Sequence, residues 1–562
     1  FIIRIHSSFH IILLILIRRI HMRIITLRSS YKTLSVSEVQ SMPNVSIREK
    51  YNGRQAMGNI FKIWVLALSI TYLVCIFHQP LLSASELSEE EQVSLVKEAT
   101  VKIYTVYNSP DYSNPWRMLE MNSGGGSGAV IENNRILTCA HVVSDQTFIQ
   151  VQRYGRVKRF NARVVSVSHE VDLAILTVDE EEFFSDIIPL KVGELPKTQQ
   201  EVLVYGYPAG GDTLSITQGI LSRVEHQSYV HSRYSFLAGQ IDAAVNPGNS
   251  GGPVMVDGQI VGVAMQGIDE LENAGYMVPA PIIKHFLKDI EDGRQDGIPD
   301  IGVLVQNMEN PDIKRKYKMP QSRTGVLIYS VLPNSPAKGI LENDDVLLSI
   351  NGHLIADNGT VEFRPMERTR FAYYLEILQM GEIINVEYLR KGKIHTASFK
   401  LNRRSEAFSL VPEEQYDRLP RYFIYGGIVF SPLTKNLINS VGREYEVAED
   451  LLVEYYYNWP SEKRKEVVVA IQVLAHDINA GYHDLYCWIV KEVNGKEIQD
   501  FNEFYSLVND FSGTYMTFKD KNGWQIVIDH EKAQESHEII LQNYHIPKDR
   551  FLGMGKTLQT QE

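Results

Sequence analysis

The segment Val245–Pro253 has the sequence Val-Asn-Pro-Gly-Asn-Ser-Gly-Gly-Pro, in which a serine lies among glycines. Glycine adopts backbone angles that other residues avoid, so the segment predicts a tight turn that exposes Ser250. Such a turn can aim the N–H groups of Gly248 and Ser250 at one point, which is the arrangement of an oxyanion hole. We therefore predict that Ser250 is a nucleophile rather than part of an ordinary glycine- and serine-rich loop.

A serine nucleophile needs a base with a pKa near neutrality and a carboxylate that holds this base in the right tautomer. His141 lies in Thr-Cys-Ala-His-Val-Val after an apolar stretch, and Asp172 directly precedes Leu-Ala-Ile-Leu. Taken singly, His141 also fits a packed core histidine and Asp172 a turn residue. Together with Ser250, their order and flanking residues predict a catalytic triad.

The order His, Asp, Ser with these flanks resembles the chymotrypsin-like proteases, and Asn249 before Ser250 is similar to their HtrA/Deg branch. Nearly the whole chain after Glu86 resembles the plant Deg-type proteases and their bacterial relatives. The implied fold is mainly β, with a chymotrypsin-like double β-barrel followed by two PDZ-like α+β domains. Three further segments carry the resemblance: Ser123–Gly128, Tyr205–Pro208 and Gln218–Ile220.

The resemblance implies that Ala264, Met265 and Gln266 belong to the strand that pairs with extended substrate. Asn249 cannot form the ion pair that an aspartate before the serine makes in zymogen-activated enzymes of this fold, so control is expected from loops or peptide-binding domains. No aspartate clearly marks the base of a specificity pocket. Asp242 is the nearest candidate, and we favour Val, Ile or Ala before the cleaved bond.

The region from Val101 to Gln266 alternates short Val-, Ile-, Leu- and Tyr-rich segments with Gly, Pro, Asn and Asp, which predicts many short strands. A helix is expected over Glu86–Glu98 and another over Pro281–Asp292, which closes a protease domain of residues 86–295. The clearest expected strands are Arg135–Leu137, Phe148–Gln152, Ala162–Val167, Leu173–Val178, Glu201–Tyr205 and Ile260–Met265.

Residues 296–404 resemble a PDZ domain, with a strand at Gly325–Ile328 and a second strand that ends in the Asn351–Gly352 turn. PDZ domains add a peptide strand to a sheet edge and bind its terminal carboxylate on backbone N–H groups. By position, Ile301, Gly302 and Val303 form the predicted carboxylate loop.

Two features of this domain depart from the common PDZ pattern. Asp344 occupies a usual glycine position, and the loop Asp357–Arg370 is longer than normal.

Residues 405–562 are expected to form a second, divergent PDZ-like domain, a degenerate duplicate of the first. Its strands are predicted near Gly427–Phe430, Val467–Leu474 and Trp488–Val493, followed by an Asn494–Gly495 turn. No segment reads as a convincing carboxylate loop. Docking or assembly is as consistent with this region as peptide capture.

The N-terminal residues indicate a targeting segment rather than a folded domain. Residues 1–56 carry nine Lys/Arg and two Asp/Glu without clear periodicity, and we interpret them as a non-native upstream extension or a disordered segment. From Met57, a lysine, the apolar run Ile63–Phe77 and the small residues before Glu86 predict a signal peptide over residues 57–85. The run is shorter than the roughly 20 residues that span a bilayer. The expected location is therefore exported, with the periplasm as the specific prediction.

Charge and ligand patterns exclude several other functions. The formal net charge is −12, and removal of residues 1–85, which carry +8, leaves −20, so binding to nucleic acid is not expected. His169–Glu170 begins like a zinc-protease motif, but Leu173 stands where its second histidine would be. His226, His231 and His285 show no ligand spacing and are expected on the surface or in packing. No metal or cofactor is expected, and the three cysteines cannot form a disulfide framework.

The most specific prediction is an ATP-independent serine endopeptidase that degrades unfolded or damaged proteins and is regulated through its PDZ domains. Its expected partners are unfolded protein and peptide substrates, and C-terminal peptides at the PDZ domain. The resemblance also implies a homo-trimer or larger homo-oligomer. The alternative is a peptide-binding chaperone or scaffold with a latent triad.

Overall fold

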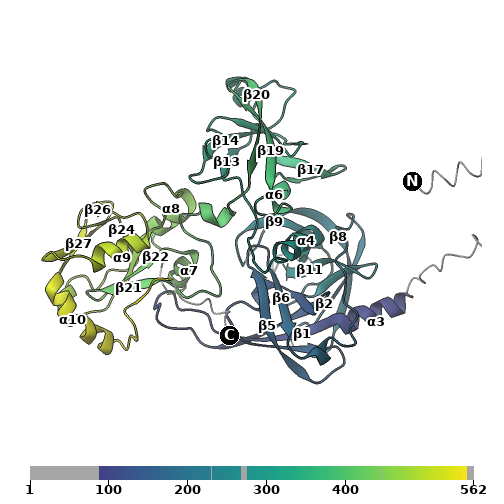
Figure 1. Cartoon of the computed structure of the whole chain (residues 1–562), viewed down its shortest axis with the longest axis horizontal. Helices are drawn as coiled ribbons and strands as arrows, with labels where there is room; N and C mark the ends of the chain where they lie inside the picture. Colours follow the sequence, from purple (N-terminus) through teal and green to yellow (C-terminus); the bar gives the residue numbers. More distant parts are fainter. Residues whose placement is uncertain (1–87, 210, 230, 268–274, 445, 554–562) are drawn as a thin grey trace, which may run out of the picture. The chain divides into compact units, whose positions relative to one another are not determined.

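The computed structural model describes residues 88–209, 211–229, 231–267, 275–444 and 446–553 (Figure 1). The predicted upstream segment (1–56) and signal peptide (57–85) lie outside these residues. No helix within the described ranges has the length and apolar character needed to cross a bilayer. The first described element is α3 (Glu89–Ala99), close to the predicted helix. Ser88 begins it with a capping box, in which Ser88 and Glu91 each accept a hydrogen bond from the other's backbone N–H.

Six antiparallel strands form a first closed barrel in the order β1-β2-β3-β6-β5-β4. Along β1, buried and more exposed residues alternate because successive strand side chains point to opposite faces. Val101 and Ile103 are fully buried on the inner face. The strands are β1 (Thr100–Tyr107), β2 (Asn122–Ile131), β3 (Arg135–Thr138), β4 (Gln146–Arg153), β5 (Arg159–Ser168) and β6 (Leu173–Val178).

Six further strands form a second closed barrel in the order β10-β11-β12-β9-β8-β7, followed by α4 (Ala280–Asp289). All six strands predicted for the protease domain lie within β3, β4, β5, β6, β7 and β11, so these predictions are confirmed. The strands are β7 (Glu201–Gly206), β8 (Ser215–Ser228), β9 (Ser235–Ile241), β10 (Pro253–Val256), β11 (Gln259–Gly267) and β12 (Gly275–Pro279).

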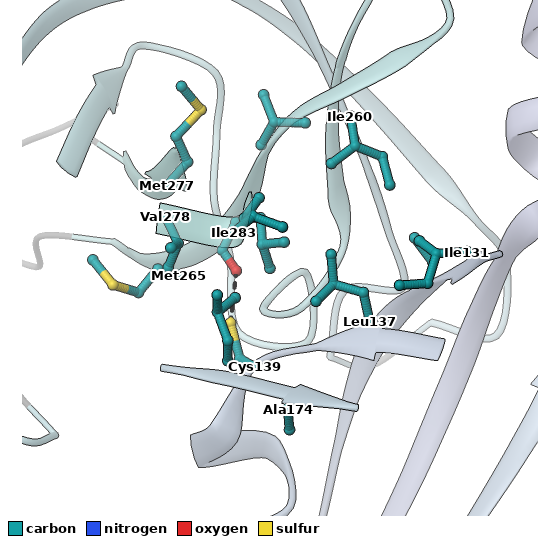
Figure 2. Packing of buried hydrophobic residues seen from close by; sticks show 14 of the residues in the cluster. Ile131, Leu137, Cys139, Ala174, Ile260, Met265, Met277, Val278 and Ile283 are labelled. Atoms are coloured by element: carbon teal, nitrogen blue, oxygen red, sulfur yellow. Dashed lines mark hydrogen bonds between the residues drawn. The ribbon is translucent and has the colours of Figure 1, made fainter. Parts of the chain in front are cut away.

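The buried side chains of the two barrels form one continuous apolar cluster. Figure 2 shows its centre, where Leu137 and Cys139 of the first barrel approach Met265 and Val278 of the second. The Cys139 thiol donates a hydrogen bond to the carbonyl oxygen of Ala264 at 3.2 Å, which ties the barrels together. Cys139 and Cys487 are both buried free thiols.

The next domain contains a sheet in the order β13-β14-β15-β19-β20, with β16 (His353–Leu354) paired to β15. Asn351 and Gly352 both have positive φ, as the predicted Asn-Gly turn requires. Asp344, at the usual glycine position, also has a positive φ of 73°. The sheet strands are β13 (Val303–Gln306), β14 (Val326–Val331), β15 (Val346–Ile350), β19 (Ile383–Arg390) and β20 (Lys393–Lys400).

The long loop Asp357–Arg370 of this domain contains a hairpin of β17 (Thr360–Arg364) and β18 (Glu367–Arg370). Two short helices complete the domain, α5 (Pro311–Lys316) and α6 (Tyr373–Glu376). Glu376 of α6 is buried and pairs with His226 of β8 at 2.9 Å, so α6 contacts the second barrel.

The last domain has two sheets, in the orders β24-β23-β22-β21-β29 and β26-β25-β27-β28. The preceding domain also has two sheets, the second being the hairpin of β17 and β18. The predicted strands are present in this domain, and Asn494 and Gly495 form the predicted turn between β25 and β26.

The elements of the last domain are β21 (Tyr422–Tyr425), β22 (Ile428–Pro432), α7 (Lys435–Glu444), α8 (Glu449–Tyr457), β23 (Val468–Val473), β24 (Trp488–Val490), β25 (Glu492–Val493), β26 (Lys496–Glu497), α9 (Phe501–Asn509), β27 (Tyr515–Lys519), β28 (Gln525–Asp529), α10 (His530–Asn543) and β29 (Arg550–Phe551).

Candidate active site

The side chains of His141 and Asp172 lie in direct contact. His141 belongs to a single 3-10 turn directly after β3, and Asp172 directly precedes β6, which pairs with β3. The Nδ1 atom of His141 lies 2.8 Å from Oδ2 and 3.0 Å from Oδ1 of Asp172. The backbone N–H of His141 also donates to Oδ1, at 2.9 Å. The predicted base and carboxylate are thus joined in the geometry that fixes an Nδ1–H tautomer.

The surroundings of this pair favour opposite charges on its two members. Asp172 has no exposed side-chain surface, and its φ of 56° lies in the left-handed region that aspartate tolerates better than most residues. Burial would raise its pKa, but the charge and hydrogen bond of His141 outweigh burial and lower it. For His141, burial would lower the pKa, but Asp172 outweighs burial and raises it.

The loop between β9 and β10 carries Ser250 and depends on glycine at two positions. Gly248 has a φ of 96° and Gly251 a φ of 84°. A Cβ atom would lie only 2.4 Å from the Tyr207 carbonyl oxygen at position 248, and 2.2 Å from the Ser127 carbonyl oxygen at position 251. Any larger residue is therefore strained at either position, both by φ and by contact.

Ser127, on β2, holds this loop from the opposite barrel. Its N–H donates to the Ser250 carbonyl oxygen at 2.8 Å, and its hydroxyl donates to the Gly248 carbonyl oxygen at 2.8 Å. The same hydroxyl accepts from the Tyr207 N–H at 2.8 Å. The sequence analysis included Ser127 only within the glycine-rich segment that resembles the family, and it predicted no role for this residue. The one signal in the sequence was that Ser127 is the single serine within Gly124–Gly128.

The two N–H groups predicted to form the oxyanion hole are available. In the described ranges, the N–H groups of Gly248 and Ser250 donate to no protein atom. The neighbouring N–H groups are engaged: Asn249 donates to Asn246, and Gly251 donates to Ala264. The loop therefore presents the two predicted donors without an internal partner. Asn249 itself is buried, at 2% exposure.

The predicted substrate strand lies directly beside the serine. Ala264 and Met265 are buried on β11, and Gln266 pairs through its backbone with Tyr276 of β12. The Ser250 hydroxyl donates to the carbonyl oxygen of Met265 at 3.2 Å. Among the described residues no hydrogen bond joins Ser250 to His141. Asp242, the candidate for a specificity pocket, accepts instead from the backbone N–H of Ile220.

Tyr229, which the sequence did not single out, also reaches the triad. Its hydroxyl oxygen lies 2.9 Å from Nδ1 of His141, and the residue is 2% exposed. Nothing in the sequence separates this tyrosine from the many others, because its contact depends on how the turn between β8 and β9 folds over the first barrel.

The other histidines considered from the sequence lie in packing contacts. His231 stacks on Tyr416 with ring centroids 3.6 Å apart, and burial lowers its pKa to about 3. His226 pairs with Glu376. His285 is 4% exposed, and burial lowers its pKa to about 4.

One group of metal-type donors occurs within the triad region. The donor atoms of Cys139, His141 and Asp172 lie within 4.8 Å of one another. A cysteine ligand must be deprotonated, and burial raises the pKa of the Cys139 thiol well above its ordinary value. The donor chemistry of this group therefore suits a triad better than a metal centre.

The first PDZ-like domain presents an open edge but an occupied carboxylate loop. In the described ranges, β13, which starts at Val303, pairs only with β14. The N–H of Gly302 donates to the side chain of Asp300 at 2.7 Å, and Ile301 is buried. A Cβ at Gly302 would lie 2.9 Å from the ring of Phe408, so this ring covers the loop. A peptide carboxylate needs both groups to move.

The last domain contains a glycine pair that the sequence analysis did not identify as a candidate carboxylate-binding loop. Gly426 and Gly427 join β21 to β22, and both have positive φ. Asn479 donates to the carbonyl oxygen of Gly426 at 2.8 Å and fills the space beside Gly427. β22 pairs with both β21 and β23, and the outer strands of this sheet are β24 and β29. Docking and peptide capture both stay predictions for this domain.

Two six-stranded barrels with a histidine–aspartate pair beside a glycine-bounded serine define a serine peptidase of the chymotrypsin-like class. Residues 126–263 match the trypsin-like peptidase domain family, and residues 411–551 match a PDZ domain family. The chain belongs to the HtrA/Deg family and is a serine endopeptidase of the HtrA type.

The relatives span most of the chain. It is 38% identical to "Protease Do-like 4, mitochondrial" of Arabidopsis thaliana, over 83% of this chain and 87% of that protein. It is 35% identical to "Protease Do-like 2, chloroplastic" of the same plant, over 83% of this chain and 78% of that protein. A solved structure, "HtrA-type protease AlgWS227A with decapeptide", matches 57% of this chain and 98% of its own, with 22% identity and a TM-score of 0.46.

Proposed function

We propose that the chain is an ATP-independent endopeptidase that cleaves unfolded or damaged proteins, with Ser250 as nucleophile, His141 as general base and Asp172 as the group that orients His141. The observation that carries this proposal is the 2.8 Å contact between His141 and Asp172 beside the loop of Ser250. An unfolded chain fits a site in which the substrate adds to β11 through its backbone, since a folded protein cannot present such a strand.

The proposed reaction begins when the Ser250 hydroxyl turns from Met265 toward His141. Its oxygen attacks the substrate carbonyl carbon while Nε2 of His141 takes the hydroxyl proton. The N–H groups of Gly248 and Ser250 stabilise the oxyanion. His141 then gives its proton to the leaving amine, and water hydrolyses the acyl-enzyme in the same way. Asp172 remains ionised and stabilises the imidazolium.

Casein cleavage by the purified chain tests the proposal. Ser250→Ala and His141→Ala should each abolish cleavage to a similar extent, and the double variant should be no slower, because members of one catalytic unit are not additive. A fluorophosphonate should label Ser250 in the wild type. Binding of casein without cleavage or labelling would favour the alternative, a chaperone or scaffold with a latent triad, which the contact between Ser250 and Met265 keeps open.

We further propose that peptides with apolar C-termini bind at the edge of β13 and raise the activity. The open edge of β13 supports this role, while Asp300 and Phe408 hold the loop in a closed form. A peptide shifts such an equilibrium only through its higher affinity for the open form. Phe408→Ala should therefore lower the peptide concentration needed for activation, measured by casein cleavage against peptide concentration. No response to a broad peptide set would refute this mode of control.

We also propose that the protein is exported and that its signal peptide is cleaved near Ser85. For the oligomeric state, we propose a homo-trimer or a larger homo-oligomer. If translation starts upstream of Met57, the alternative is targeting to an organelle. N-terminal sequencing of the native protein distinguishes these addresses, and analytical ultracentrifugation measures the assembly.

A further inference from the structure

Two backbone hydrogen bonds hold Tyr229 at the start of the turn between β8 and β9. Its N–H donates to the Tyr234 carbonyl oxygen at 2.9 Å, and its carbonyl oxygen accepts from the Arg233 N–H at 2.8 Å. Arg233 has a φ of 60°, which closes the turn. At 2% exposure the Tyr229 side chain is buried, so its hydroxyl needs a hydrogen-bond partner inside the protein.

Among the described residues, the acceptor that suits the Tyr229 hydroxyl proton is the Asp172 carboxylate. The hydroxyl oxygen lies 2.9 Å from Nδ1 of His141. In the tautomer that catalysis needs, Nδ1 carries a proton directed at Asp172 and cannot accept another. The ionised carboxylate is an acceptor, and its hydrogen bond with Tyr229 is one of the contacts that lower the Asp172 pKa.

We propose that Tyr229 is a positioning residue for the triad, which donates to Asp172 and thereby fixes the carboxylate against His141. This inference rests on the proposed function of the triad. Asp172 has no exposed side-chain surface, so protein donors must replace the water that would hydrate it. The backbone N–H of His141 supplies one donor at 2.9 Å, and Tyr229 supplies another from the second barrel. The carboxylate is therefore fixed from both barrels.

The hydroxyl of Tyr229 also sets the basicity of His141. A carboxylate that receives an extra hydrogen bond attracts the Nδ1 proton less strongly, so loss of this bond is expected to raise the pKa of His141. Other titratable groups close to the pair are His231, Cys139 and Tyr416, and His169, which is paired with Asp417, lies beside His231. Burial lowers the pKa of His231 to about 3 and raises those of Cys139 and Tyr416 far above neutrality. These three groups are neutral between about pH 5 and 8, and a titration that observes the His141 ring itself separates its shift from any change at His169.

Tyr229→Phe tests this proposal because it removes the hydroxyl and keeps the ring. We expect kcat to fall about 10-fold with little change in KM, since loss of a hydrogen bond to the carboxylate costs about 1.4 kcal/mol, which is the free energy of a tenfold change in rate. The acid limb of kcat/KM should move to higher pH by about 0.5 unit or more. Tyr234→Phe is the matched control, because it alters the paired residue of the same turn and should leave both quantities unchanged.

An NMR titration of the His141 ring in Ser250→Ala, with and without Tyr229→Phe, measures the same pKa shift without turnover. If Tyr229→Phe does not fold, 3,5-difluorotyrosine at position 229 strengthens the donor and should shift the acid limb to lower pH. An unmoved limb in either variant, or an activity loss that only follows the unfolded fraction, overturns the inference. If wild-type protein neither cleaves casein nor reacts with fluorophosphonate, the proposed function fails instead.

Discussion

The hydroxyl of Ser250 donates to the carbonyl oxygen of Met265 at 3.2 Å, so the nucleophile is bonded to the strand on which substrate is expected to lie. A substrate that pairs with β11 competes for the same oxygen. Its backbone N–H can replace the serine hydroxyl and leave that hydroxyl free to turn to His141. This hydrogen bond predicts that substrate pairing and activation of the nucleophile are coupled at one atom.

This coupling predicts that a backbone N–H next to the cleaved bond matters more than its single hydrogen bond suggests. A peptide substrate with an N-methyl group on the residue before the cleaved bond is expected to lose about 10- to 100-fold in kcat/KM, a cost of about 1.4 to 2.8 kcal/mol. The measurement compares cleavage rates of methylated and unmethylated peptides. A peptide methylated several residues away is the control, and equal rates for all three would contradict the coupling.

Ser127→Ala should loosen the loop of Ser250. The change leaves the Tyr207 N–H and the Gly248 carbonyl oxygen without their partner, which costs about 1–3 kcal/mol of stability. Because the N–H of Gly248, in the same loop, forms half of the expected oxyanion hole, kcat should fall about 10- to 100-fold with a smaller change in KM. Ser123→Ala, at an exposed position of the same strand, is the control. Steady-state kinetics that match between these variants would show that Ser127 does not hold the loop.

The acid limb of the pH profile should lie above pH 6.5. The base must be neutral to accept the serine proton, and the pair with Asp172 raises the pKa of His141 above its ordinary value despite burial. Activity therefore rises as pH increases through this raised pKa. In Asp172→Asn the raising contact is lost and kcat should fall by about 10⁴-fold. Wild-type kcat/KM that is already maximal at pH 6 would contradict the expectation.

The sequence was sufficient for the features that depend on local chemistry. Glycine around Ser250 dictates its turn, Asn-Gly dictates the turn at Asn351, and short Val-, Ile-, Leu- and Tyr-rich segments between turn residues indicate the barrel strands. The contacts of Ser127 and Tyr229 could not be predicted, because each joins segments that only the closed barrels bring together. The closed state of the Gly302 loop was equally inaccessible, since it depends on Phe408, about a hundred residues away in sequence.

Glu170 should make the stability of the protein depend on pH in an unusual direction. One carboxylate oxygen accepts from the Ile298 N–H at 3.2 Å. The other is buried and, among the described residues, has no hydrogen-bond partner. Burial, the largest influence, raises the pKa of Glu170 to about 7 from 4.5. The folded state therefore binds the proton more tightly than the unfolded state does. The contribution of Glu170 to the free energy of unfolding is therefore fully present below about pH 4.5. It is lost as the pH rises to about 7.

Glu170→Gln removes the charge and keeps the shape, so it should stabilise the protease domain at pH 8 by about 2–3 kcal/mol and change little at pH 5. Thermal unfolding of both proteins at pH 5, 6, 7 and 8 measures the difference. Glu194→Gln, at a carboxylate whose side chain is 89% exposed, should show no such trend. A gain from Glu170→Gln that is the same at pH 5 and pH 8 would mean that ionisation of this buried carboxylate is not what costs stability.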